Sequence, residues 1–415
     1  MKNFLVHNDN VKREMLHSIG IKTTDELFSQ IPEAARFSDA NFGSAMSEME
    51  VQRAIKQLAK ENHSDFIDFK GGGVYNKFVP ACISQIAQRF EFLTAYTPYQ
   101  AEISQGTLQI MYEFQTMISR LTGMDIANAT VYDGATACAE ALLMAVRISK
   151  KDKVLVKKDL NPEYLDVIKT YMWAGDIIVD YVDEIPANTA EYAGIIIQTP
   201  NYYGEIQDIK PVDDTLLIVC TDLSTLAILK PPAEYGADIV VADIQSLGIP
   251  MSFGGPHAGV IACKEKFMRQ MPGRLAGRTV DADGNQAFTL TIQTREQHIK
   301  REKATSNICS NQALMGLWVT LYLSVLGEKG FRQASYLSTK NAHTLADKLT
   351  QKGYSIENKN FFNEFTVVTD NADEYLKQLE LVNISGGIKL DDKRILVAVT
   401  EMISEEDIEL YSETI

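Results

Sequence analysis

The fold is decided by residues 216–246, which read LLIVCTDLSTLAILKPPAEYGADIVVADIQS. This stretch contains two short runs that are rich in Val and Ile, residues 216–220 and 238–241. Four more runs of this kind occur at residues 153–156, 177–179, 193–197 and 260–263, most of them separated by helix-length segments. Nearly continuous apolar strands that alternate with helices are typical of a mostly parallel sheet with helices on both faces. We therefore predict an α/β fold.

The segments around this sheet predict two further parts. Residues 1–65 alternate short amphipathic helical patterns with polar breaks, which favours a helical arm that packs on a core or on another subunit. Residues 66–330 are predicted to form the large α/β domain. Long helices are expected between residues 311 and 352, with Gly327 and Gly330 as breaks. The later pattern of strand, helix, strand and strand predicts a small α+β domain over residues 331–415.

Composition excludes several classes of protein. The 415 residues include 40 basic and 55 acidic side chains, and this net charge of −15 argues against a protein that coats nucleic acid or an anionic membrane. No apolar run has the length of a membrane span or of a signal peptide, so we predict a cytoplasmic protein. The five widely spaced cysteines are interpreted as reduced, and the six histidines form no metal-binding motif, so no metal site is expected.

Open α/β sheets bind ligands at the carboxyl ends of their strands. One such place is the turn Asp133-Gly134-Ala135-Thr136, which precedes a predicted helix. Free backbone N–H groups and the positive end of the helix dipole suit a phosphate there, although such a turn also simply begins a helix. A second place is Asp222, directly after a strand. It can pair with a protonated ring nitrogen of a cofactor or cap the next segment.

The order of these features is informative. A phosphate-type turn, a strand-end Asp, and a strand that leads to Gly254-Gly255-Pro256 are similar to the ground plan of aspartate-aminotransferase-like pyridoxal phosphate (PLP) enzymes. In those enzymes a lysine after the last strand holds the cofactor as a Schiff base. This chain has Gln245 and Ser246 at that place, and neither side chain can form the bond.

Longer motifs resemble one family, the P-protein of the glycine cleavage system, and within it the alpha subunit of the two-subunit bacterial form. The matching strings are FLTAYTPYQAEISQG at 92–106, YDGATA at 132–137, QSLG at 245–248, GGP at 254–256, MPGR at 271–274 and TREQHIKREKATSNIC at 294–309. The likeness covers residues 11–401. It implies the PLP-dependent transferase fold, in which alpha and beta subunits share one architecture and only the beta subunit carries the cofactor lysine.

The resemblance also implies a function. The complex decarboxylates glycine on PLP and transfers the aminomethyl group to the lipoyl arm of H-protein, and T-protein handles the product. This chain is then a subunit of an aminomethyl-transferring glycine dehydrogenase, inactive alone, with no covalently bound cofactor and no catalytic lysine. It is expected in a heterotetramer of two alpha and two beta subunits, with the working site at their interface. Gly134, Ala135, Thr136 and Asp222 are candidates for a vestigial cofactor pocket.

Two segments are candidates for the interface or the substrate cleft. Residues Tyr96, Thr97, Tyr99 and Gln100 offer two phenols, a hydroxyl and an amide beside a stiffening proline, which suits a small zwitterion or the lipoyl arm. The alternative is a buried loop that satisfies its own backbone. By the resemblance, Thr305, Ser306 and Asn307 reach the partner's phosphate, although capping of the next helix fits equally.

Several points stay open at this level. Arg295, His298 and Glu302 are expected on one face of a charged helix, either as a subunit contact or as a solvated face. Lys77 stands where the family usually has histidine in the string G-x-Y-x-H-x-x-P. Two other functions remain as alternatives: a self-sufficient PLP-dependent aminotransferase or decarboxylase, and a purely structural partner subunit.

Overall fold

The computed structural model describes residues 7–37, 43–62, 65–295 and 297–415. The chain divides into two compact units, residues 1–64 and 65–415. The first unit contains helices α1 (Asp9–Ser18) and α2 (Glu48–Ala59), and neither helix buries a side chain. Helix α2 begins with a capping box between Ser47 and Glu50. Its apolar residues Val51, Ile55 and Leu58 follow helical spacing and are exposed.

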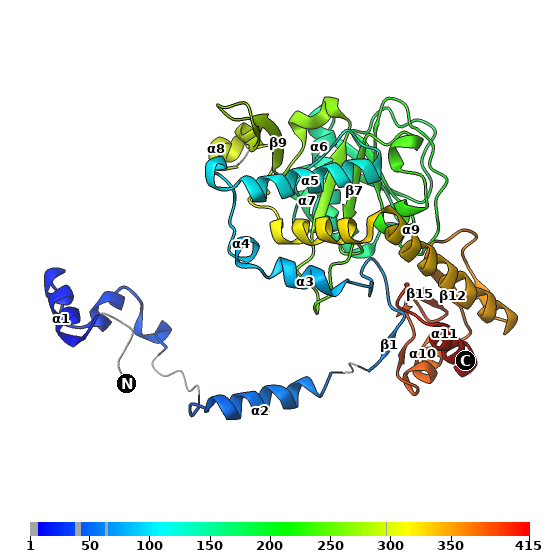
Figure 1. Ribbon diagram of the computed structural model, residues 1–415, viewed down its shortest axis with the longest axis horizontal. Coiled ribbons are helices and arrows are strands. Elements are labelled where there is room, and N and C mark those ends of the chain that lie inside the picture. The colour runs from blue at the N-terminus through cyan, green and yellow to red at the C-terminus, as the bar shows by residue number, and fades with distance from the viewer. Residues whose placement is uncertain (1–6, 38–42, 63–64, 296) are drawn as a thin grey trace. The chain divides into compact units, whose positions relative to one another are not determined.

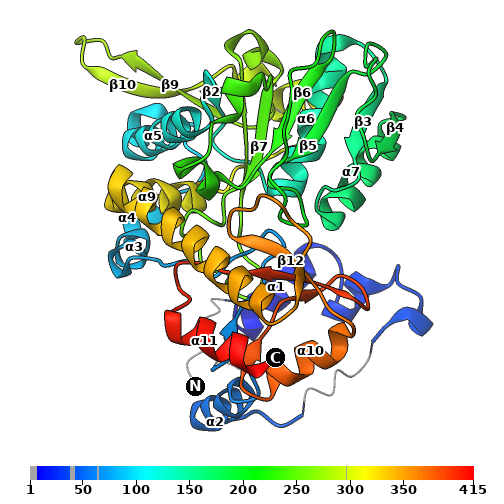
Figure 2. The ribbon, with the colours of Figure 1, turned by 90° about the vertical axis from the view of Figure 1, so that its right-hand side faces the viewer.

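The second unit is built on a seven-stranded sheet with the order β2-β8-β7-β6-β5-β3-β4 (Figures 1 and 2). The bounds of the strands are β2 Ile126–Ala127, β3 Lys153–Lys157, β4 Ile178–Val182, β5 Gly194–Gln198, β6 Leu216–Cys220, β7 Ile239–Asp243 and β8 Gly259–Cys263. Strands β3 to β7 run parallel, whereas β8 pairs antiparallel with both β7 and β2. The mostly parallel sheet predicted from the apolar runs is therefore confirmed.

Helices cover both faces of this sheet. Helix α5 (Gln105–Thr122) and the first part of α9 (Ala313–Gln351) pack on one face through residues such as Phe114, Ile118 and Tyr322. Helices α6 (Gly134–Ser149) and α7 (Pro162–Ala174) pack on the other (Figure 2). Because both faces are covered, the inner positions of β3, β5, β6, β7 and β8 are buried and apolar, and the polar residues of these strands lie at their ends.

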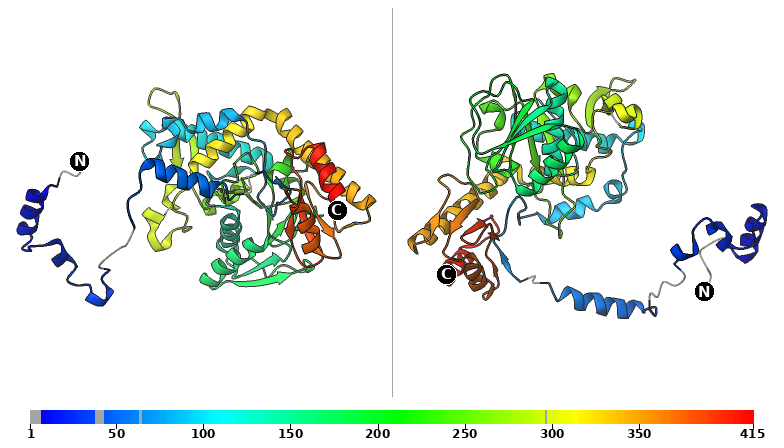
Figure 3. Two further views of the ribbon diagram at one scale, coloured as in Figure 1. Left: turned by 90° about the horizontal axis from the view of Figure 1, so that it is seen from below. Right: turned by 180° about the vertical axis from the view of Figure 1, so that it is seen from behind.

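Helix α9 continues from the large sheet into the small C-terminal part (Figure 1). It bends at Gly327, whose backbone is not helical (φ 59°, ψ −176°), as the sequence predicted. The second predicted break, at Gly330, is wrong, because this residue continues the helix. The four-stranded sheet there has the order β11-β12-β15-β14, and the C-terminus lies beside it (Figure 3). The bounds of its elements are β11 Ser355–Ile356, β12 Glu364–Val368, α10 Ala372–Glu380, β14 Ile388–Lys389, β15 Arg394–Ala398 and α11 Glu405–Thr414.

The remaining elements connect these parts. Strand β1 (Ile67–Asp68) pairs with β13 (Ile384–Ser385), so the chain enters the second unit at its C-terminal part. Helices α3 (Ala81–Ala87) and α4 (Phe90–Leu93) then lead to α5. Strands β9 (Leu275–Val280) and β10 (Gln286–Thr291) form a hairpin that the apolar pattern did not predict.

The predicted charged helix around residues 294–303 is wrong. The chain there forms three short pieces: a 3-10 turn at Gln293–Arg295, α8 (Gln297–Lys300) and a second 3-10 turn at Arg301–Lys303. Arg301 has a positive φ of 53°, which interrupts helical geometry. Arg295 and Glu302 therefore do not share one helix face, and the side chain of His298 lies outside the described residues.

The described residues form neither a membrane-spanning helix nor a metal-binding cluster. None of the helices has the length and apolar character that a bilayer crossing requires. No group of three or more His, Cys, Asp and Glu side chains within the described ranges is arranged to hold a metal ion. The five cysteines are free thiols, and three of them, Cys138, Cys220 and Cys263, are buried.

Candidate functional site

A cavity lies at the carboxyl ends of the parallel strands. Gln198, Cys220 and Asp243 end strands β5, β6 and β7, and all three line it. Asn161, the residue before α7, also lines it. Residues 362–364, which belong to the part of the chain that carries the four-stranded sheet, also line the cavity. We call it the strand-end cavity; it has a volume of about 50 Å³.

Gln245 and Ser246 have different roles in this region. The side chain of Gln245 accepts a hydrogen bond from the backbone N–H of Tyr75 (2.9 Å) and donates to the carbonyl oxygen of Tyr75 (2.9 Å). Gln245 therefore fastens the loop after β7 to the segment at residue 75. Ser246 lines the strand-end cavity and its hydroxyl donates to Asp222. The sequence assigned both residues to the place of the cofactor lysine. Of the two, only Ser246 lines the cavity.

Asp222 both caps a helix and lines the cavity. Its carboxylate accepts hydrogen bonds from the backbone N–H of Ser224 (2.9 Å) and from the Ser224 hydroxyl (2.8 Å). The same carboxylate accepts from Ser246. The sequence left two roles open for this aspartate, capping and a place in a pocket. The structure shows that Asp222 occupies a position that allows both.

The beginning of α6 is occupied by carboxylates. Asp133 caps the helix and accepts a hydrogen bond from the N–H of Thr136 (2.7 Å). Asp243, at the end of β7, accepts from the N–H of Gly134 (3.1 Å). Gly134, Ala135 and Thr136 are buried, and none of the three lines the strand-end cavity. Two carboxylates thus take the N–H groups of Gly134 and Thr136, which would otherwise attract a phosphate.

The residues of the strand-end cavity do not fit PLP. A Schiff base needs an amine, and among the described residues no lysine lines the cavity. The phosphate of the cofactor needs donors or cations, but the charged residues that line the cavity are the acids Asp222, Asp243 and Glu364. The cavity volume is also far too small for a pyridine ring with a phosphate arm.

Glu364 is a functional candidate that sequence reasoning missed. It lies on β12 of the small sheet and accepts hydrogen bonds from the N–H of Gly72 (2.6 Å) and the hydroxyl of Tyr75 (2.9 Å). Burial raises the pKa of Glu364 to about 7, against the lowering effect of these two donors. Burial likewise raises the pKa of Asp243 to about 6. No local sequence signal indicates a glutamate that reaches the cavity from another part of the fold.

A second, cationic pocket lies at the other predicted segment. Arg274 and Arg295 line a cavity of about 20 Å³ together with Thr305 and Ser306, and we call it the arginine pocket. The guanidinium of Arg274 donates to the hydroxyl of Tyr99 (3.1 Å) and to the carbonyl oxygen of Cys309 (3.0 Å). Arg274 thereby joins the two segments that the sequence singled out separately.

The interface candidates differ in exposure. Tyr96 is 81% exposed and Tyr99 is 48% exposed, so this loop is not the buried, self-satisfied loop of the alternative interpretation. Thr97 is partly buried, and Gln100 and Asn307 are exposed. Residues 305–307 do not cap the next helix, because α9 begins at Ala313 after Gln312. Their contact with a partner stays a prediction.

Glu140 contacts Ser306, a residue that lines the arginine pocket. This glutamate of α6 is buried, and burial raises the pKa of its carboxyl, against the lowering effects of a hydrogen bond with Ser306 and of the nearby Arg147. Arg147 in turn donates to the carbonyl oxygen of Gln270 (3.2 Å). Helix α6 is thus tied to the segment at residue 306 through a polar contact that does not involve the strand-end cavity.

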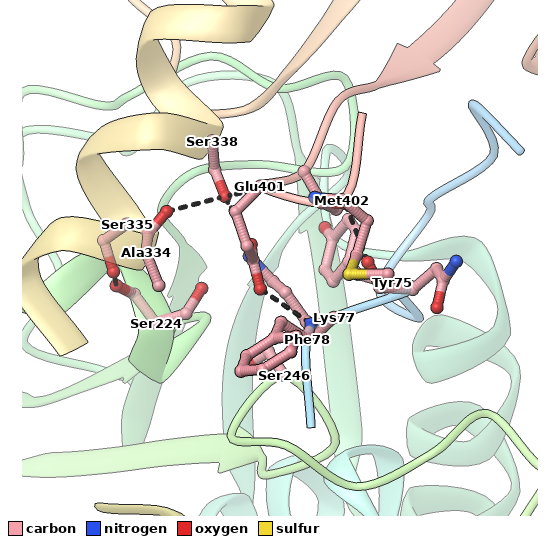
Figure 4. A network of polar contacts seen from close by, with 12 residues as sticks. Tyr75, Lys77, Phe78, Ser224, Ser246, Ala334, Ser335, Ser338, Glu401 and Met402 are labelled. Atoms are coloured by element: carbon pink, nitrogen blue, oxygen red, sulfur yellow. Dashed lines mark hydrogen bonds and ion pairs between the residues drawn. The ribbon is translucent and has the colours of Figure 1, made fainter. Parts of the chain in front are cut away.

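Lys77 forms a buried ion pair (Figure 4). Its Nζ lies 3.3 Å from Oε2 of Glu401 and 3.3 Å from Oγ of Ser338. The Ser338 hydroxyl donates to the same carboxylate (2.7 Å), and the N–H of Phe78 donates to its other oxygen (2.9 Å). This network connects the segment at residue 77 with α9 and with the chain after β15, and Lys77 does not line the strand-end cavity.

Comparisons with known proteins agree with this architecture. Residues 2–414 match the family model of the glycine cleavage system P-protein. The chain is 44% identical to the probable glycine dehydrogenase (decarboxylating) subunit 1 of Carboxydothermus hydrogenoformans, over 97% of each chain. It is also 44% identical to the protein of the same name from Thermotoga maritima, over 98% of each chain.

Solved structures give the same result. A crystal structure of glycine decarboxylase (P-protein) of the glycine cleavage system, in inhibitor-bound form, covers 100% of both chains with a TM-score of 0.90 and 37% identity. A Lactobacillus brevis glutamate decarboxylase, 12% identical with a TM-score of 0.61 over 95% of this chain and 96% of its own, shares the fold alone. The predicted PLP-dependent transferase-like fold and the family resemblance are both confirmed. The chain belongs to the glycine cleavage system P-protein family.

Proposed function

We propose that this chain is the subunit of a cytoplasmic glycine-decarboxylating complex that lacks the cofactor lysine and completes the site of a lysine-bearing partner. The observation that carries the proposal is the strand-end cavity, which has Ser246 in place of an amine and acids in place of phosphate-binding groups. In the complex, PLP held by the beta subunit supplies the electron sink for decarboxylation. The aminomethyl group then passes to the lipoyl arm of H-protein.

The arginine pocket is the part of this chain that we assign to the shared site. Two guanidinium groups beside two hydroxyls suit an anionic group such as a phosphate or a carboxylate. Tyr96, Thr97, Tyr99 and Gln100 lie on the neighbouring loop, where exposed phenols and an amide can orient a small zwitterion or the lipoyl arm. In this proposal Arg274 positions the loop and the segment at residue 306 relative to each other.

Exposed apolar side chains support an obligate partner. In the arm, Val51, Ile55 and Leu58 form an exposed stripe on α2. In the second unit, Phe90 and Phe253 are almost or fully exposed. Large apolar side chains that stay exposed in one chain commonly mark a protein interface. A beta subunit that covers them, in an assembly of two alpha and two beta subunits, accounts for this exposure.

The test is to mix this chain with the beta subunit. Visible absorbance after addition of PLP, and exchange of labelled bicarbonate into glycine, are measured for each subunit alone and for the mixture. We expect exchange only in the mixture and no internal-aldimine band in this chain alone. A band or activity in the isolated chain would favour a self-sufficient enzyme.

A milder change tests the loop. Tyr99→Phe removes the hydroxyl that Arg274 binds, and a single hydrogen bond to a charged group contributes about 1.5–3 kcal/mol. We expect glycine–bicarbonate exchange by the mixture to fall roughly 10- to 150-fold, with unchanged assembly in sedimentation. Tyr336→Phe, a similarly exposed tyrosine of α9, is the matched control. Full activity in Tyr99→Phe would support a purely structural role for this chain.

A further inference from the structure

The strand-end cavity is acidic, and the proposed function gives this negative charge no ligand. Asp222, Asp243 and Glu364 line it, and within the described ranges none of the three forms an ion pair. His257 influences Asp243 electrostatically without an ion pair between them. The donors to these acids are neutral: backbone N–H groups and the hydroxyls of Tyr75, Ser224 and Ser246. A carboxylate accepts about four hydrogen bonds, so acceptor capacity remains.

A second observation points to a ligand. Asn363 is only 3% exposed, it lines the same cavity, and its Nδ2 has no hydrogen-bond partner. A buried amide donor without a partner costs roughly 1–3 kcal/mol, so such donors usually face water or a ligand. The cavity therefore offers negative charge and one free donor together. A molecule with both an ammonium group and a hydrogen-bond acceptor satisfies the two at once.

The volume of the cavity limits the size of this molecule. One water needs at least about 10–15 Å³ of such space, so a cavity of about 50 Å³ holds roughly four waters. That space suits a ligand of about five non-hydrogen atoms. A metal ion is a poorer fit, because within the described chain no three acids converge in the way that metal coordination requires.

We propose that the strand-end cavity of this chain binds a small α-amino acid of glycine size, with its ammonium group at Asp222 and Glu364 and its carboxylate at Asn363. The ligand stays chemically unchanged, because no nucleophilic amine from the part of the chain that the structure describes lines the cavity. The site goes beyond the proposed function, since it needs neither PLP nor the beta subunit. A ligand at this place contacts two parts of the fold: Asp222, which follows strand β6 of the large sheet, and Glu364, on strand β12 of the small sheet.

Calorimetry on the isolated full-length chain, without cofactor, tests the site. Glycine, methylamine and acetate are titrated separately at a pH of about 8, above the raised pKa values of Glu364 and Asp243. We expect glycine to bind with a Kd of about 1 mM, methylamine about 5-fold more weakly, and acetate not to bind. Asp222→Asn is expected to weaken glycine at least 10-fold. Asn363→Ala is expected to weaken glycine about 5-fold and to leave methylamine unchanged.

Controls keep the test decisive. Glu328→Gln changes an exposed acid of α9 and is expected to leave glycine binding unchanged. Circular dichroism establishes folding of each variant, and Glu364→Gln replaces Asp222→Asn should the latter fail to fold. No binding of glycine or methylamine, equal binding of acetate, or full competition by sodium chloride at matched concentration would each overturn the proposal. Because the beta subunit is absent, none of these results bears on glycine–bicarbonate exchange by the complex.

Discussion

Lys77→Ala is expected to lower the free energy of unfolding by about 3–5 kcal/mol, because it leaves the carboxylate of Glu401 buried without its cation. The two side chains are only 3% and 5% exposed. After the change, the Ser338 hydroxyl and the N–H of Phe78 still donate to Glu401, but two neutral donors do not replace a positive charge. The measurement is urea unfolding of the isolated chain, followed by circular dichroism.

A matched variant separates burial from the loss of a lysine. Lys340 of α9 pairs with Glu405 at 3.3 Å, but these side chains are 47% and 81% exposed. Lys340→Ala is expected to cost no more than about 1 kcal/mol, because water screens an exposed pair. Similar losses of stability in both variants would contradict the assignment of Lys77 to a buried network.

The position of Lys77 also explains its sequence context. By the resemblance, a histidine is expected where this chain has Lys77, and the sequence alone left open whether residue 77 has a chemical role. The structure shows an ion pair that ties residue 77 to α9 and to the chain after β15. A single sequence does not reveal such partners, because they lie far from residue 77 along the chain.

Local patterns predicted most of the fold. The six apolar runs became β3 to β8 within a few residues, because a strand buried on both faces has a strong and continuous apolar signal. The hairpin of β9 and β10 was missed because its residues, such as Arg278 and Thr289, are polar and partly exposed. The predicted helix at 294–303 was wrong because charge spacing alone does not reveal the backbone break at Arg301.

The candidate site was only partly visible in the sequence. The sequence brought Asp222 and Ser246 together as residues of one pocket, because both follow recognisable strands. The structure confirms that they are in contact, whereas the missing cofactor lysine stays a prediction. Glu364, Asn363 and Arg274 were not identified, since each reaches its pocket from an element distant in sequence. Sequence periodicity indicates on which face of its own helix or strand a residue lies. It does not indicate which other helix or strand packs against that face.

Glu364 makes stability depend on pH. Its pKa is raised by burial from 4.5 to about 7, so the folded chain holds this proton more tightly than the unfolded chain does. The contribution is complete below pH 4.5 and is lost as the pH rises through about 7. Each pKa unit corresponds to 1.36 kcal/mol, which gives a loss of roughly 3 kcal/mol across this range. Asp243 acts in the same direction through its raised pKa of about 6.

Glu364→Gln isolates this contribution. Glutamine keeps the side-chain shape and an oxygen that accepts from Gly72, but it does not titrate. Relative to the wild type, the variant is expected to gain roughly 3 kcal/mol of stability between about pH 4.5 and pH 8, because only the wild type must ionise a buried acid. Asp243 titrates in both proteins, and its effect therefore cancels in the difference. Urea unfolding at several pH values measures this difference, and Glu328→Gln, an exposed acid, should follow the wild type throughout. A constant difference across the range would mean that Glu364 is ionised already at low pH and that the hydrogen bonds from Gly72 and Tyr75 outweigh its burial.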